Sequence, residues 1–105
     1  MYFAMNRFKV NKGRENDFEK VWRNRKSYLD EVPGFLGFDL LRGAPGEEYS
    51  VFISHSKWAS ENAFTLWTKS EAFKKAHRQA RTPEGILLGH PVLETYSGVE
   101  LAKQQ

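Results

Sequence analysis

Alternation of apolar and polar residues predicts four strands, at Tyr2–Val10, Phe35–Arg42, Tyr49–His55 and Val92–Val99. On the first strand every second residue falls on one face, and that face is apolar apart from Asn6. The turn-forming sequence Gly43-Ala44-Pro45-Gly46 separates the second strand from the third. These two strands are therefore expected to form a hairpin.

Apolar residues at helical spacing predict two helical regions. The first extends for roughly four turns and is marked by Phe18, Val21, Trp22, Arg25, Tyr28 and Leu29. Pro33-Gly34 is expected to end it. The second begins at Ser60 as N-cap and continues through Ala63, Phe64 and Trp67. A second start signal at Ser70-Glu71 predicts a break or kink at Lys69-Ser70, followed by a stripe of Phe73, Ala76, His77 and Ala80.

The resulting element order, β-α-β-β-α-β, predicts an α+β ferredoxin-like fold. In that fold the helices cover one face of a four-stranded antiparallel sheet. A chain of 105 residues without repeats or linkers is expected to form a single domain over 1–105. Little chain remains to cover the second sheet face, so we expect a homodimer.

Composition excludes several classes of protein. There is no cysteine, which rules out disulfides and thiolate chemistry. The net charge of +3 is spread along the chain, and the densest basic group, Arg23, Arg25 and Lys26, is too small to predict nucleic-acid binding. No apolar run is long enough to span a membrane and no signal peptide is apparent, so a cytoplasmic location is expected. Eight Phe, four Tyr and three Trp residues are many for this length and favour an aromatic pocket or interface.

His77 is the most informative of the three histidines. The small residues Ala76 and Ala80 leave room beside it on the helical stripe. A neutral imidazole there could bind haem iron while Phe73 packs against the macrocycle, or it could simply hydrogen-bond a carbonyl. His55, at the end of a predicted strand, and His90, in a loop, are expected at the surface.

Asn6 and Trp67 each allow two interpretations. Asn is depleted in strands, so Asn6 either donates a hydrogen bond to a ligand or marks a bulge or edge. Trp67 precedes His77 by ten residues, and a straight helix would separate the two by about 80°. A kink near Ser70 would bring them together; otherwise Trp67 is an ordinary core residue.

Known cofactor motifs are absent. The sequence contains no G-x-G-x-x-G, no P-loop, no H-E-x-x-H and no G-x-S-x-G. A flavin or nicotinamide site in this chain is therefore not expected.

Several segments together resemble a known family. They are Asn6-Arg7-Phe8, Gly34-Phe35-Leu36-Gly37-Phe38, the run from Trp58 to Trp67, and the run from Ser70 to Arg78. The last two follow the pattern W-x-S-x-x-A-F-x-x-W and S-x-x-F-x-x-A-H. In these segments and over nearly its whole length, the chain resembles the IsdG-type haem-degrading monooxygenases of the antibiotic-biosynthesis-monooxygenase fold.

The resemblance implies roles for individual residues. His77 would be the proximal iron ligand, Asn6 the distal amide that hydrogen-bonds oxygen at the iron, and Trp67 the group that presses on the porphyrin and favours its ruffling. Phe64 and Phe73 would complete the haem contacts. The groups that hold the haem propionates are not identified, and the loop from Arg81 to Pro91 is shorter than in some members.

The implied activity is oxidative degradation of haem to an open-chain tetrapyrrole with release of iron. It needs dioxygen and an external electron donor, and the implied assembly is a dimer whose sheets form a shared barrel. Two alternatives stay open. One is a cofactor-free monooxygenase of quinol-like aromatics with the same fold, and the other is a non-catalytic haem carrier or sensor.

Overall fold

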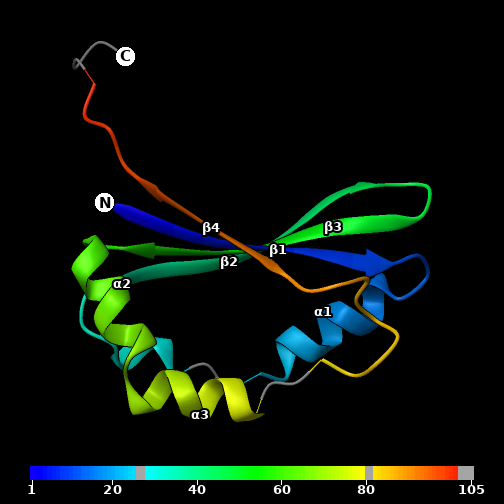
Figure 1. The fold of residues 1–105 in the computed structure, drawn as a ribbon, viewed down its shortest axis with the longest axis horizontal. Coiled ribbons are helices and arrows are strands. Elements are labelled where there is room, and N and C mark those ends of the chain that lie inside the picture. Colours follow the sequence, from blue (N-terminus) through cyan, green and yellow to red (C-terminus); the bar gives the residue numbers. More distant parts are fainter. Residues whose placement is uncertain (26–27, 80–81, 102–105) are drawn as a thin grey trace.

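The computed structural model describes residues 1–25, 28–79 and 82–101, and it has the expected α+β ferredoxin-like fold (Figure 1). The elements are β1 (Tyr2–Asn11), α1 (Glu15–Arg23), the short 3-10 helix η1 (Leu29–Glu31), β2 (Phe35–Pro45), β3 (Tyr49–Trp58), α2 (Glu61–Thr68), α3 (Glu71–Gln79) and β4 (Val92–Ser97). The strands form one antiparallel sheet in the order β2-β3-β1-β4. The three α-helices lie on one face of it (Figure 1). In the described part of the chain, no helix is long and apolar enough to cross a membrane.

The central strand β1 has the predicted two faces. Tyr2, Ala4, Phe8 and Val10 are buried on the helix side, whereas Arg7 and Lys9 are exposed on the other. Asn6 shares the helix side and is half-buried. Its Cα partners are Ser54 on β3 and Leu93 on β4. The backbone therefore places Asn6 in the middle of the sheet, so it is neither at an edge nor in a bulge.

The first helix is shorter than its apolar spacing predicts. α1 ends at Arg23 after 9 residues, and Asn24 is its C-cap. Tyr28 then adopts a left-handed conformation with φ of 59°, so the chain turns before Leu29 enters the core from η1. Tyr28 and Leu29 match the helical spacing, but the prediction that they extend the first helix to Pro33-Gly34 was wrong. Periodicity reports which residues face the core and does not detect such a turn.

The strands also differ from their predicted ends. β2 continues through Gly43 and Ala44 to Pro45, and a register shift between Arg42 and Pro45 absorbs the extra residues as an irregularity of an edge strand. β3 extends to Trp58, which places His55 inside the strand and half-buried instead of at a surface end. β4 ends at Ser97, two residues before the predicted Val99.

The predicted break between the second and third helices is present. Ser60 caps α2, since its Oγ accepts a hydrogen bond from the Ala63 amide at 3.1 Å. Ser70 begins α3 in the same way, with its Oγ 3.1 Å from the Phe73 amide, and it also donates to the Trp67 carbonyl at 2.6 Å. One hydroxyl therefore ends α2 and caps α3. Ala80 and Lys26, which belong to the predicted stripe and basic group, lie outside the described residues.

The apolar core consists of two separate clusters. One contains Phe8, Val10, Phe18, Phe52 and Ile86, and the other contains Tyr2, Leu29 and Trp58. Between them the sheet presents small or polar side chains to the helices: Ala4, Asn6, Ser54 and Ser56. The middle of the sheet is thus left without the large apolar residues that would join the clusters into one core.

No described element covers the second face of the sheet (Figure 1). On β3 this face carries Tyr49, Val51 and Ile53, whereas the helix side carries three buried serines. Across the face, the Phe3 and His55 rings stack with centroids 5.6 Å apart. Glu94 on β4 accepts from Arg7 at 3.2 Å and from the Tyr96 hydroxyl at 2.9 Å. The open face is therefore a mixture of apolar side chains and paired polar groups.

Candidate active site

A cavity of about 730 Å³ lies between the sheet and the helices. Its volume is within the range of about 300–1,000 Å³ that is usual for small-molecule sites. All five residues singled out from the sequence line it: Asn6, Phe64, Trp67, Phe73 and His77. The long loop before β4 contributes Thr82, Leu87 and Pro91, while Arg81 lies outside the described residues.

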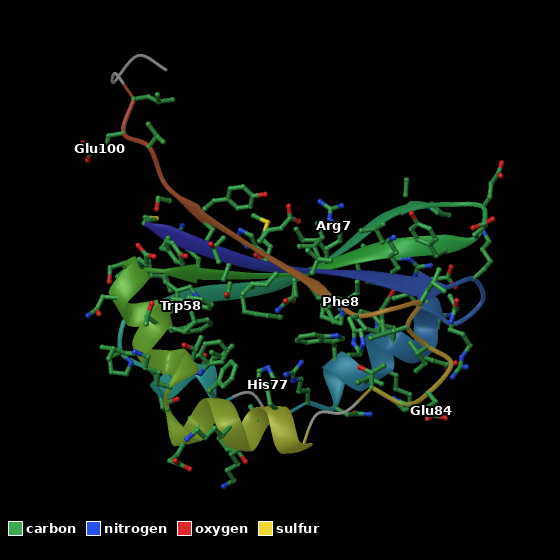
Figure 2. All side chains as sticks on the ribbon, in the orientation of Figure 1. Arg7, Phe8, Trp58, His77, Glu84 and Glu100 are labelled. Carbon is green, nitrogen blue, oxygen red and sulfur yellow. The ribbon has the colours of Figure 1, made fainter. Side chains whose placement is uncertain are left out.

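His77 reaches the cavity from α3, on the side of that helix that faces the sheet (Figure 2). Its Nδ1 lies 3.1 Å from the carbonyl oxygen of Phe73. A carbonyl only accepts, so this hydrogen bond requires a proton on Nδ1. In the neutral ring Nε2 then carries the free lone pair, which is the state that a metal ligand needs. The carbonyl contact and the ligand role, which the sequence offered as alternatives, are therefore compatible.

A row of aromatic side chains forms one wall of the cavity. Trp67 packs on Trp58 with ring centroids 5.3 Å apart and meets Phe73 edge-to-face at 4.7 Å. Phe73 in turn packs on the His77 ring at 4.0 Å, and Phe64 lies 6.1 Å from Trp67. Because the helix breaks at Ser70, the Phe73 ring lies between Trp67 and His77 and contacts both. The indole Nε1 of Trp67 is buried and has no hydrogen-bond partner among the described residues.

The sheet side of the cavity is less polar than its composition suggests. Ser56 already has partners within the protein, because its Oγ accepts from Trp58 Nε1 at 2.9 Å and donates its one proton to the Ala4 carbonyl at 3.2 Å. The side chains of Asn6 and Ser54 make no hydrogen bond within the described part of the chain. Two unpartnered polar groups therefore face the cavity from adjacent strands. Ser54 was not predicted from the sequence, because its position beside Asn6 follows only from the strand register.

Arg25 is a cation that faces the cavity. Of the Lys and Arg side chains that the structure describes, only that of Arg25 lines it, with its guanidinium 4.3 Å from the centre of the Trp22 ring. Burial lowers the pKa of Arg25 from its usual value, although arginine stays protonated at any ordinary pH. Arg23 points elsewhere and pairs with Glu19 at 2.9 Å. Of these two neighbouring arginines, Arg25 therefore lines the cavity and Arg23 does not.

The residues that line the cavity suit a planar, largely apolar ligand that carries an anionic group. Flat aromatic walls favour an extended apolar ring system, and Arg25 offers charge to an anionic group on it. His77 presents a nitrogen from the helices, while Asn6 and Ser54 present polar groups from the sheet. Haem has all the matching features: a flat macrocycle, carboxylates and an iron that accepts imidazole.

The sequence matches one protein family and relatives that share one name. A model of the family described as antibiotic biosynthesis monooxygenase matches residues 1–79. A relative from Bacillus cereus, named heme-degrading monooxygenase, is 35% identical over 89 residues, which are 83% of this chain and 81% of the relative. A protein of the same name from Listeria monocytogenes is 46% identical over 54 residues, 50% of this chain. The match spans only 45% of the length of that Listeria relative.

Solved structures share the fold over nearly the whole chain. The heme-degrader MhuD from Mycobacterium tuberculosis, whose structure has two hemes bound in its active site, superposes with a TM-score of 0.73 at 27% identity. The match covers 97% of this chain and 99% of MhuD. SnoaB from Streptomyces nogalater, described as a cofactor-independent oxygenase, has a TM-score of 0.63 at 20% identity, covering 97% and 96% of the two chains. At that identity the likeness to SnoaB concerns the fold alone.

Proposed function

Because this chain belongs to the antibiotic biosynthesis monooxygenase family, we propose that it is a haem-degrading monooxygenase. It would open haem oxidatively to an open-chain tetrapyrrole and release iron, with dioxygen and external electrons as co-reactants. The observation that carries this proposal is the cavity itself, which has a free imidazole nitrogen on its helix side and unpartnered polar groups on its sheet side. The names of the Bacillus and Listeria relatives support the same activity.

His77 would hold the substrate through Nε2. Its ring is already oriented by the Phe73 carbonyl and by packing on the Phe73 ring, so little rotational freedom is lost on binding. Haem, when bound, supplies the iron at which dioxygen is activated. Asn6 would donate a hydrogen bond to oxygen on the sheet side and orient it. Trp67 and Phe64 would confine the macrocycle.

Arg25 would bind the carboxylates of the substrate. A guanidinium inside an apolar cavity is costly to leave unpaired, and the described lining offers it one carboxylate, that of the exposed Asp30. Charge-assisted hydrogen bonds to a haem propionate would satisfy it. This assigns Arg25, and not Arg23, to the task that the sequence left open.

The electrons would come from outside the chain. No dinucleotide-binding or P-loop motif occurs in the sequence, so a reductase or a small reductant such as ascorbate must deliver them.

We also propose that two copies associate through their open sheet faces. An apolar β3 surface of Tyr49, Val51 and Ile53 favours burial, and the exposed Leu41 and Val92 extend it. Sedimentation equilibrium should find a dimer, and Ile53→Glu should convert it to a monomer. Leu66→Glu, an exposed position on α2, should leave the dimer intact. A monomeric unsubstituted protein would reject this assembly.

A haem titration followed by reduction tests the activity. A saturable Soret band that decays on addition of ascorbate in air, with iron appearing in a chelator assay, is expected. A Soret band that persists with both ascorbate and an enzymatic reductase would indicate a haem carrier or sensor. Absence of saturable binding would favour a cofactor-free monooxygenase. The cytoplasmic location and the single domain over 1–105 stay predictions, the first open to cell fractionation and the second to limited proteolysis.

A further inference from the structure

Ser54 is a polar residue at a place where a strand usually carries an apolar one. It is 5% exposed, on a central strand, facing the helices. Two other buried serines share this face of β3, and both have partners within the protein. Ser50 donates to Glu15 at 2.9 Å, and Ser56 bonds Trp58 and Ala4. The hydroxyl of Ser54 makes no hydrogen bond to the described residues.

The unpartnered hydroxyl is accessible from the cavity. Ser54 lines the cavity. Among the described residues, Trp67 Nε1 is a polar atom that is both fully buried and without a partner, whereas the Oγ of Ser54 is not fully buried. In an open cavity water can satisfy the hydroxyl. Once a largely apolar ligand displaces that water, a buried hydroxyl without a partner weakens binding of the ligand. A ligand that displaces the water therefore binds best if one of its own atoms takes over the hydrogen bond of Ser54.

Asn6 is directly opposite Ser54 across the β1–β3 ladder. Directly opposed residues of antiparallel strands have Cβ atoms about 4.5–5.5 Å apart on the same face. One small ligand can therefore reach both side chains at once. Their neighbours along the same rows, Ala4, Phe8 and Phe52, offer no polar side-chain atom, and the one proton of Ser56 is already donated to the Ala4 carbonyl. The floor of the cavity thus has one polar spot, made of an amide and a hydroxyl.

We propose that Ser54 is a second ligand-binding residue, which with Asn6 holds the small oxygen-bearing ligand on the sheet side of the substrate. The Asn6 amide donates one hydrogen bond and the Ser54 hydroxyl donates another. Two donors from different strands fix the direction of a diatomic molecule, which a single donor leaves free to rotate. The inference rests on the proposed haem binding.

Azide is a suitable probe, because it binds ferric haem and accepts hydrogen bonds. Affinity would be measured from the Soret shift of the haem-loaded protein. Ser54→Thr keeps the hydroxyl, whereas Ser54→Val replaces it with a methyl group of similar size. Val should bind azide about three- to tenfold more weakly than Thr, as the loss of one hydrogen bond predicts. Ser50→Ala removes a buried hydroxyl of the same strand face outside the cavity and should leave azide affinity unchanged.

Each result has a definite meaning. Equal azide affinity in the Thr and Val variants overturns the role of Ser54 while leaving haem binding in place. Failure of the unsubstituted protein to bind haem overturns both proposals. Should the Val variant not fold by circular dichroism, Ser54→Ala takes its place, with the same expected loss relative to Thr. The stretching frequency of carbon monoxide bound to ferrous haem is a second readout, and it should rise on loss of the donor.

Discussion

The Nδ1 atom of His77 lies 3.1 Å from the carbonyl oxygen of Phe73, one turn earlier in α3. The same two residues also pack ring on ring, with centroids 4.0 Å apart. Backbone and side chain of Phe73 thus orient one imidazole. The nitrogen that we propose as the iron ligand is therefore oriented by a residue that need not touch the iron.

Replacing His77 with Ala should remove the iron–imidazole bond. Loss of an outer partner of a metal ligand usually lowers affinity or activity about 10–100-fold, and loss of the ligand itself should lower turnover more. His90→Ala, an exposed loop residue, serves as the control. Unchanged Soret spectra and turnover in His77→Ala would contradict the assignment, and recovery on adding free imidazole would strengthen it.

Arg25→Ala should weaken haem binding about tenfold or more, because a hydrogen bond to a charged group contributes about 1.5–3 kcal/mol. The test compares haem with its dimethyl ester, in which the carboxylates are blocked. The substitution should cost affinity for haem and little for the ester. Arg23→Ala, which breaks only an exposed pair with Glu19, should bind both as the unsubstituted protein does. An equal loss for haem and ester would assign Arg25 to packing on Trp22 instead.

Trp67→Phe should separate stability from activity. The smaller ring loses apolar contact with Trp58 and Phe73, but it also removes a buried N–H that has no partner in the described structure. Since an unsatisfied buried donor costs about 1–3 kcal/mol, the two effects should largely cancel in chemical unfolding. Haem turnover should nevertheless fall if Trp67 confines the macrocycle. A variant that unfolds much more easily would mean that Nε1 is bonded to water in solution.

Ser60→Ala should destabilise the protein by about 1 kcal/mol, because it removes the side-chain cap from the Ala63 amide. Urea unfolding measures the effect. Ser60→Asp keeps an acceptor at the same position and should retain most of the stability. A loss in Ser60→Asp equal to that in Ser60→Ala would show that the cap contributes little.

The open face should have an unusual tyrosine. The hydrogen bond to Glu94 raises the pKa of Tyr96 above 10.0, and the same contact, followed by that with Arg7, lowers the pKa of Glu94 below 4.5. Ultraviolet titration, taken as a difference from Tyr96→Phe, should therefore give a Tyr96 pKa above 10 that falls towards 10 in Glu94→Ala. Arg7→Ala should raise the pKa of Tyr96 further, because the positive charge of the nearby guanidinium lowers it.

The signs of these shifts set the pH window of their contribution to stability. For Glu94 the contribution is present above the unfolded pKa of about 4.5 and is lost as the pH falls through the folded pKa. For Tyr96 it is present below about 10 and is lost as the pH rises through the raised pKa. Thermal unfolding of Glu94→Ala should match that of the unsubstituted protein in acid and fall below it near neutral pH.

Sequence patterns predicted the features that depend on periodic spacing, but not the turn of the backbone at Tyr28. Alternation placed Asn6 on the correct face of β1, and paired start signals located the break at Ser70. The length of α1 was overestimated because Tyr28 and Leu29 keep helical spacing while Tyr28 is left-handed. The spacing of apolar residues indicates which side chains become buried, but it does not determine the backbone conformation between them.

The candidate site was predictable where one residue carries a distinctive side chain. His77 and Trp67 stand out by residue type, and both line the cavity. Ser54 does not stand out, since its meaning depends on its partner across the ladder, Asn6. Arg25 could not be separated from Arg23 without knowing where α1 ends. Register and helix ends are tertiary facts that single-sequence patterns do not contain.

The double hydrogen bonding of Ser70 has a consequence for how such enzymes could diversify. Its hydroxyl donates to the Trp67 carbonyl at the end of α2 and accepts from the Phe73 amide at the start of α3, and so sets the angle between the two helices that carry Trp67 and His77. Ser70 itself does not line the cavity. A substitution there would tilt the bound ring relative to the sheet without changing any contacting side chain. Product selectivity could then drift, or be engineered, from a hinge position that an inventory of pocket residues would overlook.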